Sequence, residues 1–118
     1  MWINWKETLS NLRATAGKFA DANPKVVSAY RQLNGALGAN NALDAKTREL
    51  IALAVAVTTR CDGCISSHAA AAREAGATQA EVAEALGTAI ALNAGAAYVY
   101  SARALEAFEQ FGTEGRSA

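Results

Sequence analysis

Apolar residues recur along the chain at spacings of three and four, which predicts helices and no strand. A first helix is expected over about 4–20. A second begins at Asn23-Pro24, a cap followed by proline, and ends at Gly38. Asp44 is a suitable N-cap for a third helix over about 45–59. Because this third helix is apolar nearly all round, we expect it to be buried at the centre of the fold.

The second half of the chain also predicts helices alone. A fourth helix begins near Cys61 or Asp62, and the capping box Thr78-Gln79-Ala80-Glu81 starts a fifth. The stretch from this box to Phe111 is longer than an ordinary helix. We therefore expect a break near Asn93-Ala94-Gly95 and a sixth helix after it. The 118 residues are predicted to form one all-α domain, a single-domain bundle of five to six helices.

Composition and charge narrow the class of protein. Lys and Arg together number 11, as do Asp and Glu, so the zero net charge argues against nucleic acid as a partner. A folded chain of this size is expected to bury roughly two-thirds of its unfolded surface. The longest apolar run, Leu50–Val57, is too short to span a bilayer, so no membrane partner and a cytoplasmic location are expected. Abundant alanine buries little area, which favours self-association into a homo-oligomer. Gly112–Ala118 is expected to be a frayed tail.

The residues that could carry chemistry lie together in Cys61-Asp62-Gly63-Cys64-Ile65-Ser66-Ser67-His68. On a helix, positions 61, 64 and 68 share one face, whereas 62, 66 and 67 fall on the other side. We therefore expect both cysteines and the single histidine to face the core or a pocket. The helix N-terminus, Arg60 and His68 favour a thiolate, Asp62 opposes it, and the cysteine spacing allows a disulfide.

Glu49 is predicted to join the same site. If the third and fourth helices form an antiparallel hairpin that turns near Arg60, Glu49 and His68 are offset by roughly 4–5 Å along it. The two side chains would then meet directly or through one water. A carboxylate in an apolar helix needs a partner, and a histidine can serve. The inferred proton relay runs from Glu49 to His68 to Cys64.

Glu49 followed by Cys61-x-x-Cys64-x-x-x-His68 resembles the signature of the alkylhydroperoxidase D-like members of the carboxymuconolactone decarboxylase family. The resemblance covers about residues 43–111. It implies an all-α fold assembled as a homo-trimer or homo-hexamer. It also implies an enzyme that reduces a small hydroperoxide without a cofactor and is itself reduced by an external dithiol, either a lipoyl group or a thioredoxin-like protein.

The resemblance also implies a role for each site residue. Cys64 would attack the peroxide, Cys61 would then form the disulfide, and His68 and Glu49 would move the protons. One position departs from the well-studied peroxidase of the family, which has a second histidine immediately before its second cysteine. Here that position is Gly63, so the relay is expected to be shorter.

Several alternatives to this interpretation stay open. The chain could decarboxylate a carboxylated lactone, the other chemistry of the family, or act as a non-enzymatic redox-sensing module. Cys61, Cys64, His68 and Glu49 could together hold zinc, although the leading prediction includes no metal. The cysteines could also be small buried apolar groups. Glu49 could instead pair on the surface with Lys46 or Arg48.

Overall fold

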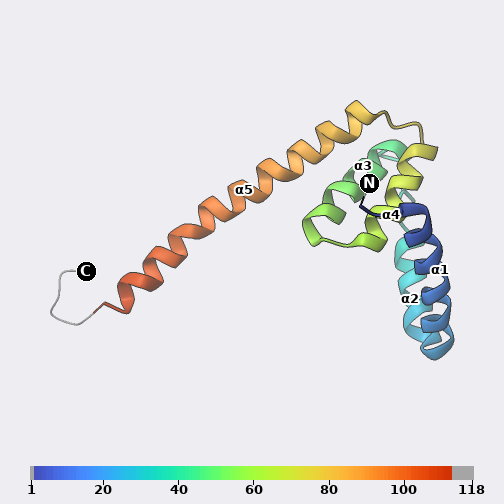
Figure 1. The fold of residues 1–118 in the computed structure, drawn as a ribbon, viewed down its shortest axis with the longest axis horizontal. Helices are drawn as coiled ribbons and strands as arrows, with labels where there is room; N and C mark the ends of the chain where they lie inside the picture. Colours follow the sequence, from blue (N-terminus) through green and yellow to red (C-terminus); the bar gives the residue numbers. More distant parts are fainter. Residues whose placement is uncertain (1, 113–118) are drawn as a thin grey trace.

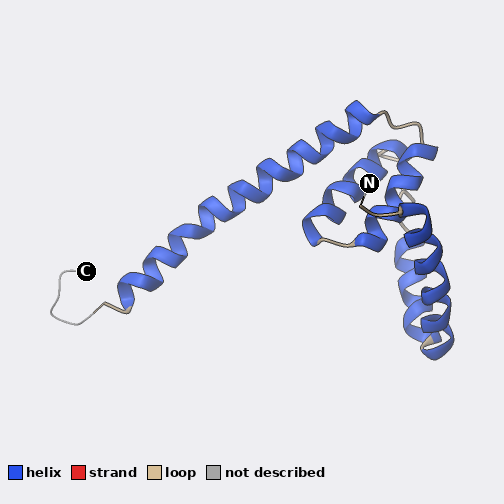
Figure 2. Cartoon of the chain, viewed as in Figure 1, coloured by secondary structure: helices blue, strands red, loops and turns tan. Residues whose placement is uncertain are grey.

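The computed structural model describes residues 2–112 and places five helices and no strand within them (Figures 1 and 2). In chain order they are α1 (Trp5–Ala22), α2 (Pro24–Gly35), α3 (Ala45–Thr59), α4 (Asp62–Glu74) and α5 (Gln79–Gln110). The prediction of an all-α fold is confirmed. Apart from Gly112, the predicted tail lies outside the described residues.

The helices begin where short polar side chains cap them. Asp44 accepts a hydrogen bond from the Thr47 N–H at 2.8 Å, so α3 has the predicted bounds. Thr78 and Glu81 form the predicted capping box at the start of α5. The end of α2 differs from the prediction, because the helix stops at Gly35 and turns connect it to Gly38. Caps depend on neighbours in sequence, which is why these starts were predictable.

The predicted break at Asn93-Ala94-Gly95 is wrong, since α5 runs through it without interruption. The Asn93 side chain donates to the Ala89 carbonyl at 2.7 Å and to the Thr58 hydroxyl at 2.9 Å. It therefore bonds back along its own helix and across to α3, and does not cap a new helix. A glycine inside a helix costs only about 1 kcal/mol. A helix inside a compact domain is limited in length by the size of the domain. This limit does not apply to α5, because residues 90–110 lie outside the core.

The helix α3 occupies the middle of the packed part of the chain. It packs against α4 and against the beginning of α5, while α1 packs against α4 and α2. Beyond its first turns α5 projects away from the other helices, and the α1–α2 hairpin projects in a different direction (Figure 1). The radius of gyration is 20.1 Å, compared with about 13 Å for a compact chain of this length.

The core of the described chain is small. Its buried apolar residues are Leu53, Ala56, Ala72 and Ala89. The accessible surface of 9589 Å² means that less than half of the unfolded surface is buried, so the two-thirds expected from chain length is wrong for one copy. The expected burial of α3 at the centre of the fold is confirmed only in part, because Leu53 and Ala56 are buried but Ile51 and Val55 are about half exposed. No described helix covers that side of α3.

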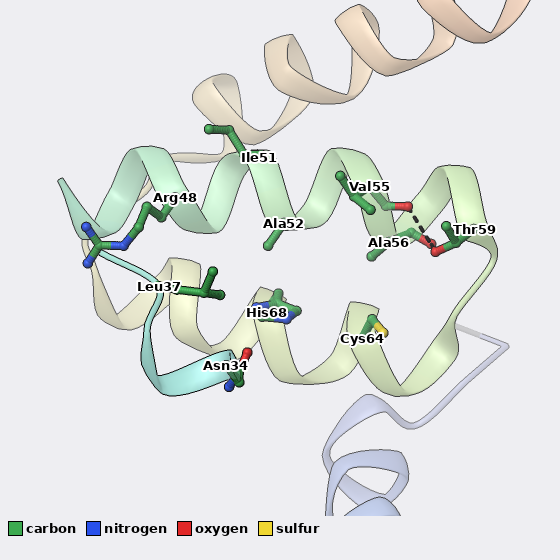
Figure 3. A pocket seen from close by; sticks show the side chains of 10 residues that line it. All are labelled: Asn34, Leu37, Arg48, Ile51, Ala52, Val55, Ala56, Thr59, Cys64 and His68. Carbon is green, nitrogen blue, oxygen red and sulfur yellow. Dashed lines mark hydrogen bonds between the residues drawn. The ribbon is translucent and has the colours of Figure 1, made fainter. Parts of the chain in front are cut away.

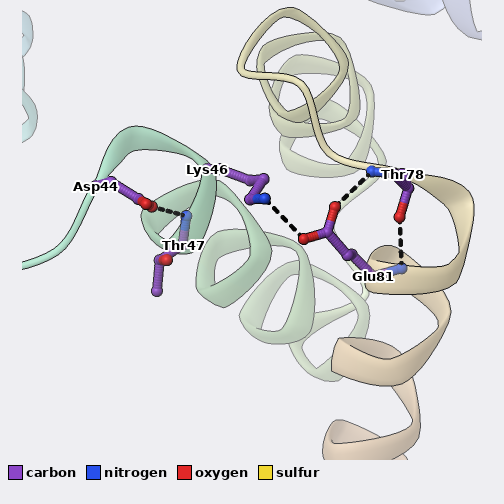
Figure 4. A network of polar contacts seen from close by, with 5 residues as sticks. All are labelled: Asp44, Lys46, Thr47, Thr78 and Glu81. Atoms are coloured by element: carbon purple, nitrogen blue, oxygen red, sulfur yellow. Dashed lines mark hydrogen bonds and ion pairs between the residues drawn. The ribbon is translucent and has the colours of Figure 1, made fainter.

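A polar link fixes the start of α5 against the start of α3 (Figure 4). The Lys46 ammonium lies 2.8 Å from the Glu81 carboxylate. Hydrogen bonding to Lys46 lowers the pKa of Glu81, and the same contact raises the pKa of Lys46. Glu81 also accepts from the Thr78 N–H at 2.9 Å, so one carboxylate both caps α5 and ties it to α3.

The composition of α5 is unusual for a helix that is so exposed. An 18-residue window within Gln79–Gln110 is strongly apolar and has few charges, so the helix is long and apolar enough to cross a membrane by length and composition alone. Uninterrupted apolar runs do not reveal this helix, because Asn93, Gly95 and Ser101 divide its apolar residues into short runs. Only a small part of that window is buried in the chain.

Candidate active site

The turn between α3 and α4 places the two cysteines. Arg60 adopts a left-handed conformation with φ of 53°, and its N–H donates to the Val57 carbonyl at 3.4 Å. The next N–H, that of Cys61, donates to the Ala56 carbonyl at 3.1 Å. This pattern is a Schellman ending, which closes α3 and starts α4 with a single residue between the turn and the new helix.

Cys61 and Cys64 form a disulfide at the N-terminus of α4, with their Cα atoms 5.2 Å apart. The Sγ atom of Cys61 also accepts a hydrogen bond from the Cys64 N–H at 3.1 Å, so Cys61 is the N-cap of the helix. Both side chains are half-buried. The unpaired N–H groups of the first turn and the positive end of the helix dipole therefore surround the sulfur atoms, as predicted, and favour a thiolate once the disulfide is reduced.

Glu49 and His68 meet across the α3–α4 hairpin. The Oε2 atom of Glu49 lies 2.7 Å from Nδ1 of His68, and the two side chains are 24% and 30% exposed. An ionised carboxylate accepts hydrogen bonds and donates none, so a neutral His68 carries its hydrogen on Nδ1. The other ring nitrogen, Nε2, then keeps a lone pair that can accept a proton. The structure thus brings Glu49 to His68, one turn of α4 from Cys64.

Cys64 and His68 open into a pocket of about 310 Å³ between α2, α3 and α4 (Figure 3). Its walls are mostly apolar, with Asn34, Arg48 and Thr59 among the polar lining groups. The full lining comprises Asn34, Leu37, Arg48, Ile51, Ala52, Val55, Ala56, Thr59, Cys64 and His68. A molecule bound in this pocket would therefore contact the Cys64 thiol and the His68 imidazole while its remaining atoms pack against apolar side chains.

Sequence reasoning missed the part of the pocket that comes from α2 and from the start of α3. The Arg48 guanidinium donates to the Leu43 carbonyl and lies against Gly38, whose φ of 78° favours glycine. This packing holds the end of α2 beside α3 and brings Asn34 and Leu37 to the pocket. The sequence contains a signal for the turn at Gly38, but none for its contact with Arg48.

On the side of α4 that faces α1, there is little room for a side chain at Gly63. A Cβ atom built on Gly63 would lie 3.1 Å from Cδ1 of Leu12 in α1. A histidine here, as in the family's well-studied peroxidase, would require Leu12 to move. Ser66, one turn later on the same face, is buried and donates to the Gly63 carbonyl at 2.9 Å. The expectation that Ser66 faces away from the packed side is therefore wrong, because α1 covers this face.

The disulfide bears on the zinc alternative. It engages both sulfur atoms that the zinc site would need as ligands. Among residues 2–112, no group of three or more His, Cys, Asp and Glu side chains is arranged to hold a metal ion. The described geometry is therefore that of a dithiol–disulfide pair beside a histidine.

Comparison with known proteins gives consistent matches. The model of the Carboxymuconolactone decarboxylase family matches residues 24–107. An uncharacterized protein of Haemophilus influenzae is 60% identical over 108 residues, covering 92% of this chain and 96% of the relative. An uncharacterized protein from the cox locus of Paracoccus denitrificans is 37% identical over 97 residues, covering 82% and 87%.

One solved structure is similar to the whole described fold. It is the crystal structure, without ligand, of a carboxymuconolactone decarboxylase family protein from Legionella pneumophila. The two structures superpose with a TM-score of 0.71 and share 36% sequence identity, over 92% of this chain and 97% of the other. The similarity therefore extends well beyond the cysteine motif.

Proposed function

Because this chain belongs to the carboxymuconolactone decarboxylase family, we propose that it is a CxxC-dependent thiol peroxidase of the alkylhydroperoxidase D-like type. The observation that carries the proposal is the Glu49–His68 contact one helical turn from Cys64, at a shared pocket. A histidine oriented by a carboxylate next to a cysteine is an arrangement that activates a thiol. The Cys61–Cys64 disulfide supplies the oxidised end of the cycle.

The proposed cycle has three balanced steps. His68 takes the proton of the Cys64 thiol, and the thiolate attacks the terminal oxygen of the hydroperoxide. The O–O bond breaks and Cys64 becomes a sulfenic acid. His68 returns the proton to the alkoxide, which leaves as an alcohol. The Cys61 thiol then attacks the Cys64 sulfur, which forms the disulfide and releases water. An external dithiol reduces the disulfide by exchange and is itself oxidised. Each turn thus converts one hydroperoxide and one dithiol into an alcohol, water and a disulfide.

The pocket supports an organic hydroperoxide as the substrate. Its walls are largely apolar, so an apolar group attached to the peroxide would gain burial there. The proposed reductant is a lipoyl group or a thioredoxin-like dithiol, and the proposed location is the cytoplasm, where thiols are kept reduced.

The first test counts thiols. Reduced protein is mixed with one equivalent of cumene hydroperoxide, and free thiols are followed over seconds. We expect rapid loss of both thiols in the wild type, with the Cys61–Cys64 disulfide identified by mass spectrometry. Cys64→Ser should slow peroxide consumption by at least about a thousandfold. Ser67→Ala, on the same helix, is the matched control and should behave as the wild type. Thiol loss no faster than that of free cysteine would reject the proposal.

A second candidate function, decarboxylation of a carboxylated lactone, rests on Arg48. Its cationic side chain lines the same pocket and could pair with a carboxylate of such a substrate. This reaction does not require the cysteine pair. Turnover of a carboxylated lactone that survives replacement of both cysteines by serine would favour it over the peroxidase.

A further inference from the structure

The chain leaves far more surface exposed than a compact protein of its mass. A compact 12.2 kDa monomer has an accessible surface of about 6,000 Å², whereas this chain exposes 9589 Å². The excess of about 3,500 Å² is of the size that permanent subunit interfaces bury. Much of it belongs to residues 90–110 of α5, all exposed, which we call distal α5. Its exposed large apolar residues include Ile90, Leu92, Tyr98, Val99, Tyr100, Leu105 and Phe108.

The pocket that holds Cys64 and His68 has a rim of apolar side chains that are also exposed. Leu37, in the turn after α2, is 64% exposed, and Ile51 and Val55 of α3 are 49% and 55% exposed. The rim continues along α2 in a stripe of exposed apolar side chains at helical spacing, Val26, Tyr30 and Leu33. Among the described helices only α1 packs along α2, and no helix lies over this stripe.

We infer that distal α5 of a second copy of this chain lies along α2 and over the open side of the pocket, so that each candidate active site is completed by a neighbouring subunit. The chain's own α5 packs only against α3 and points away from α2 (Figure 1). Asn34 of the chain's own α2 lines one wall of the pocket, so this helix does not cover its open side. This inference goes beyond the proposed function, because it holds whichever reaction the pocket performs.

The charges of the two surfaces are complementary. The helix α2 contains Lys25 and Arg31 and no acidic residue. Distal α5 contains Glu106 and Glu109 with a single cation, Arg103. The apolar stripe of α2 and the apolar sides of distal α5 would thus meet with opposite net charge at their edges, which favours this pairing over one between two α2 surfaces.

Photocrosslinking tests the contact in the intact protein. p-Benzoylphenylalanine replaces Leu37, and equal amounts of ¹⁴N- and ¹⁵N-labelled protein are mixed after unfolding and refolding together. We expect mixed-isotope crosslinks from position 37 to residues 90–110, and none when the probe replaces Glu74, an exposed residue of α4. Crosslinks confined to one chain, or joining position 37 to the α1–α2 hairpin of another copy, would overturn the inference.

Charge insertion provides a second readout. Leu105→Glu places a carboxylate on an apolar side of distal α5, while Gln110→Glu is the matched control on the polar side. In a Cys61→Ser background, where serine keeps the cap of α4, we expect Leu105→Glu to lower the sedimentation coefficient and to speed maleimide modification of Cys64 about tenfold. The control should change neither. A wild-type monomer at micromolar concentration, or wild-type protein that floats with phosphatidylcholine–phosphatidylglycerol vesicles through α5, would refute the inference.

Discussion

The α3–α4 hairpin and distal α5 are both helical and rich in apolar residues, yet they differ in what surrounds them. The hairpin holds Leu53, Ala56 and Ala72, all buried by neighbouring helices of the same chain. Distal α5 has no buried residue at all. One region is stabilised by contacts within its own chain, whereas the other leaves a large apolar surface exposed.

This difference in burial distinguishes two parts of the candidate site, the reacting groups and the enclosure of the pocket around them. The Glu49–His68 contact and the cysteine pair depend only on the α3–α4 turn, so a single chain specifies them. The enclosure of the pocket depends on groups at its open side, beyond Leu37 and Val55. The chemistry of the reacting groups should therefore respond to changes within the hairpin, and access to them should respond to changes in α5.

Among the changes that test whether the hairpin alone determines the chemistry, the largest effect is expected at His68 and at Glu49, the carboxylate that contacts it. His68→Gln should lower kcat for peroxide reduction by about 100- to 10,000-fold, because it removes the group that transfers the proton. Glu49→Gln should cost less, about 10- to 100-fold, because the ring stays in place and loses only its orienting charge. The measurement is steady-state peroxide consumption with a dithiol in excess.

Glu49 acts through His68, so its role needs a readout beyond the loss of rate. We expect Glu49→Gln to lower kcat with little change in KM, and Glu49→Asp to recover part of the rate. Glu74→Gln, which removes an exposed carboxylate from α4, is the control. Equal losses in Glu49→Gln and Glu74→Gln would mean that the relay does not operate.

A pair of leucine substitutions compares the two regions in stability. Leu53→Ala should lower the free energy of unfolding by about 2–4 kcal/mol at every protein concentration, because Leu53 is 5% exposed in the chain's own core. Leu105→Ala should lower it only at concentrations where the protein self-associates, since Leu105 touches little of its own chain. Urea unfolding at two protein concentrations a hundredfold apart measures both. Concentration-independent destabilisation by Leu105→Ala would contradict the comparison.

The local parts of the fold could be predicted from the sequence because neighbouring residues determine them. Asp44 and Thr78 cap helices through N–H groups three residues away, so the starts of α3 and α5 were predictable. The Glu49–His68 pair followed from helix geometry, since a short turn at Arg60 fixes the register of the two helices. Their roles in catalysis remain predictions.

The parts that depend on distant segments could not be predicted. Ser66 was placed on the exposed side because nothing in the sequence shows that Leu12 packs against Gly63 on that face. The break at Asn93-Ala94-Gly95 was expected because a helix of 32 residues is longer than an ordinary helix. That premise fails here, since α5 extends beyond its own chain's core.

A smaller effect is expected where α5 begins. Thr78→Ala removes the hydroxyl that accepts from the Glu81 N–H at 3.1 Å and should lower the free energy of unfolding by about 1 kcal/mol. Ser replaces this cap well, so Thr78→Ser should restore most of the loss. Thermal unfolding at one fixed protein concentration measures the three proteins. No difference between Thr78→Ala and the wild type would show that α5 is held in place by its other contacts.

The smallest expected effect is the pH dependence of the Lys46–Glu81 contact. Lys46 lowers the pKa of Glu81 in the folded chain from 4.5, so this contribution to stability is present above pH 4.5 and is lost as the pH falls through the folded value. Glu81 raises the pKa of Lys46 from 10.5, so the same contact also weakens as the pH rises through the folded value of Lys46. Glu81→Gln keeps a side chain that can complete the capping box but removes the charge. The wild type should therefore melt slightly higher than Glu81→Gln near pH 7, and the difference should vanish near pH 2. A difference in Tm that persists at pH 2 would assign the stability to packing of the α3–α5 junction and not to the ion pair.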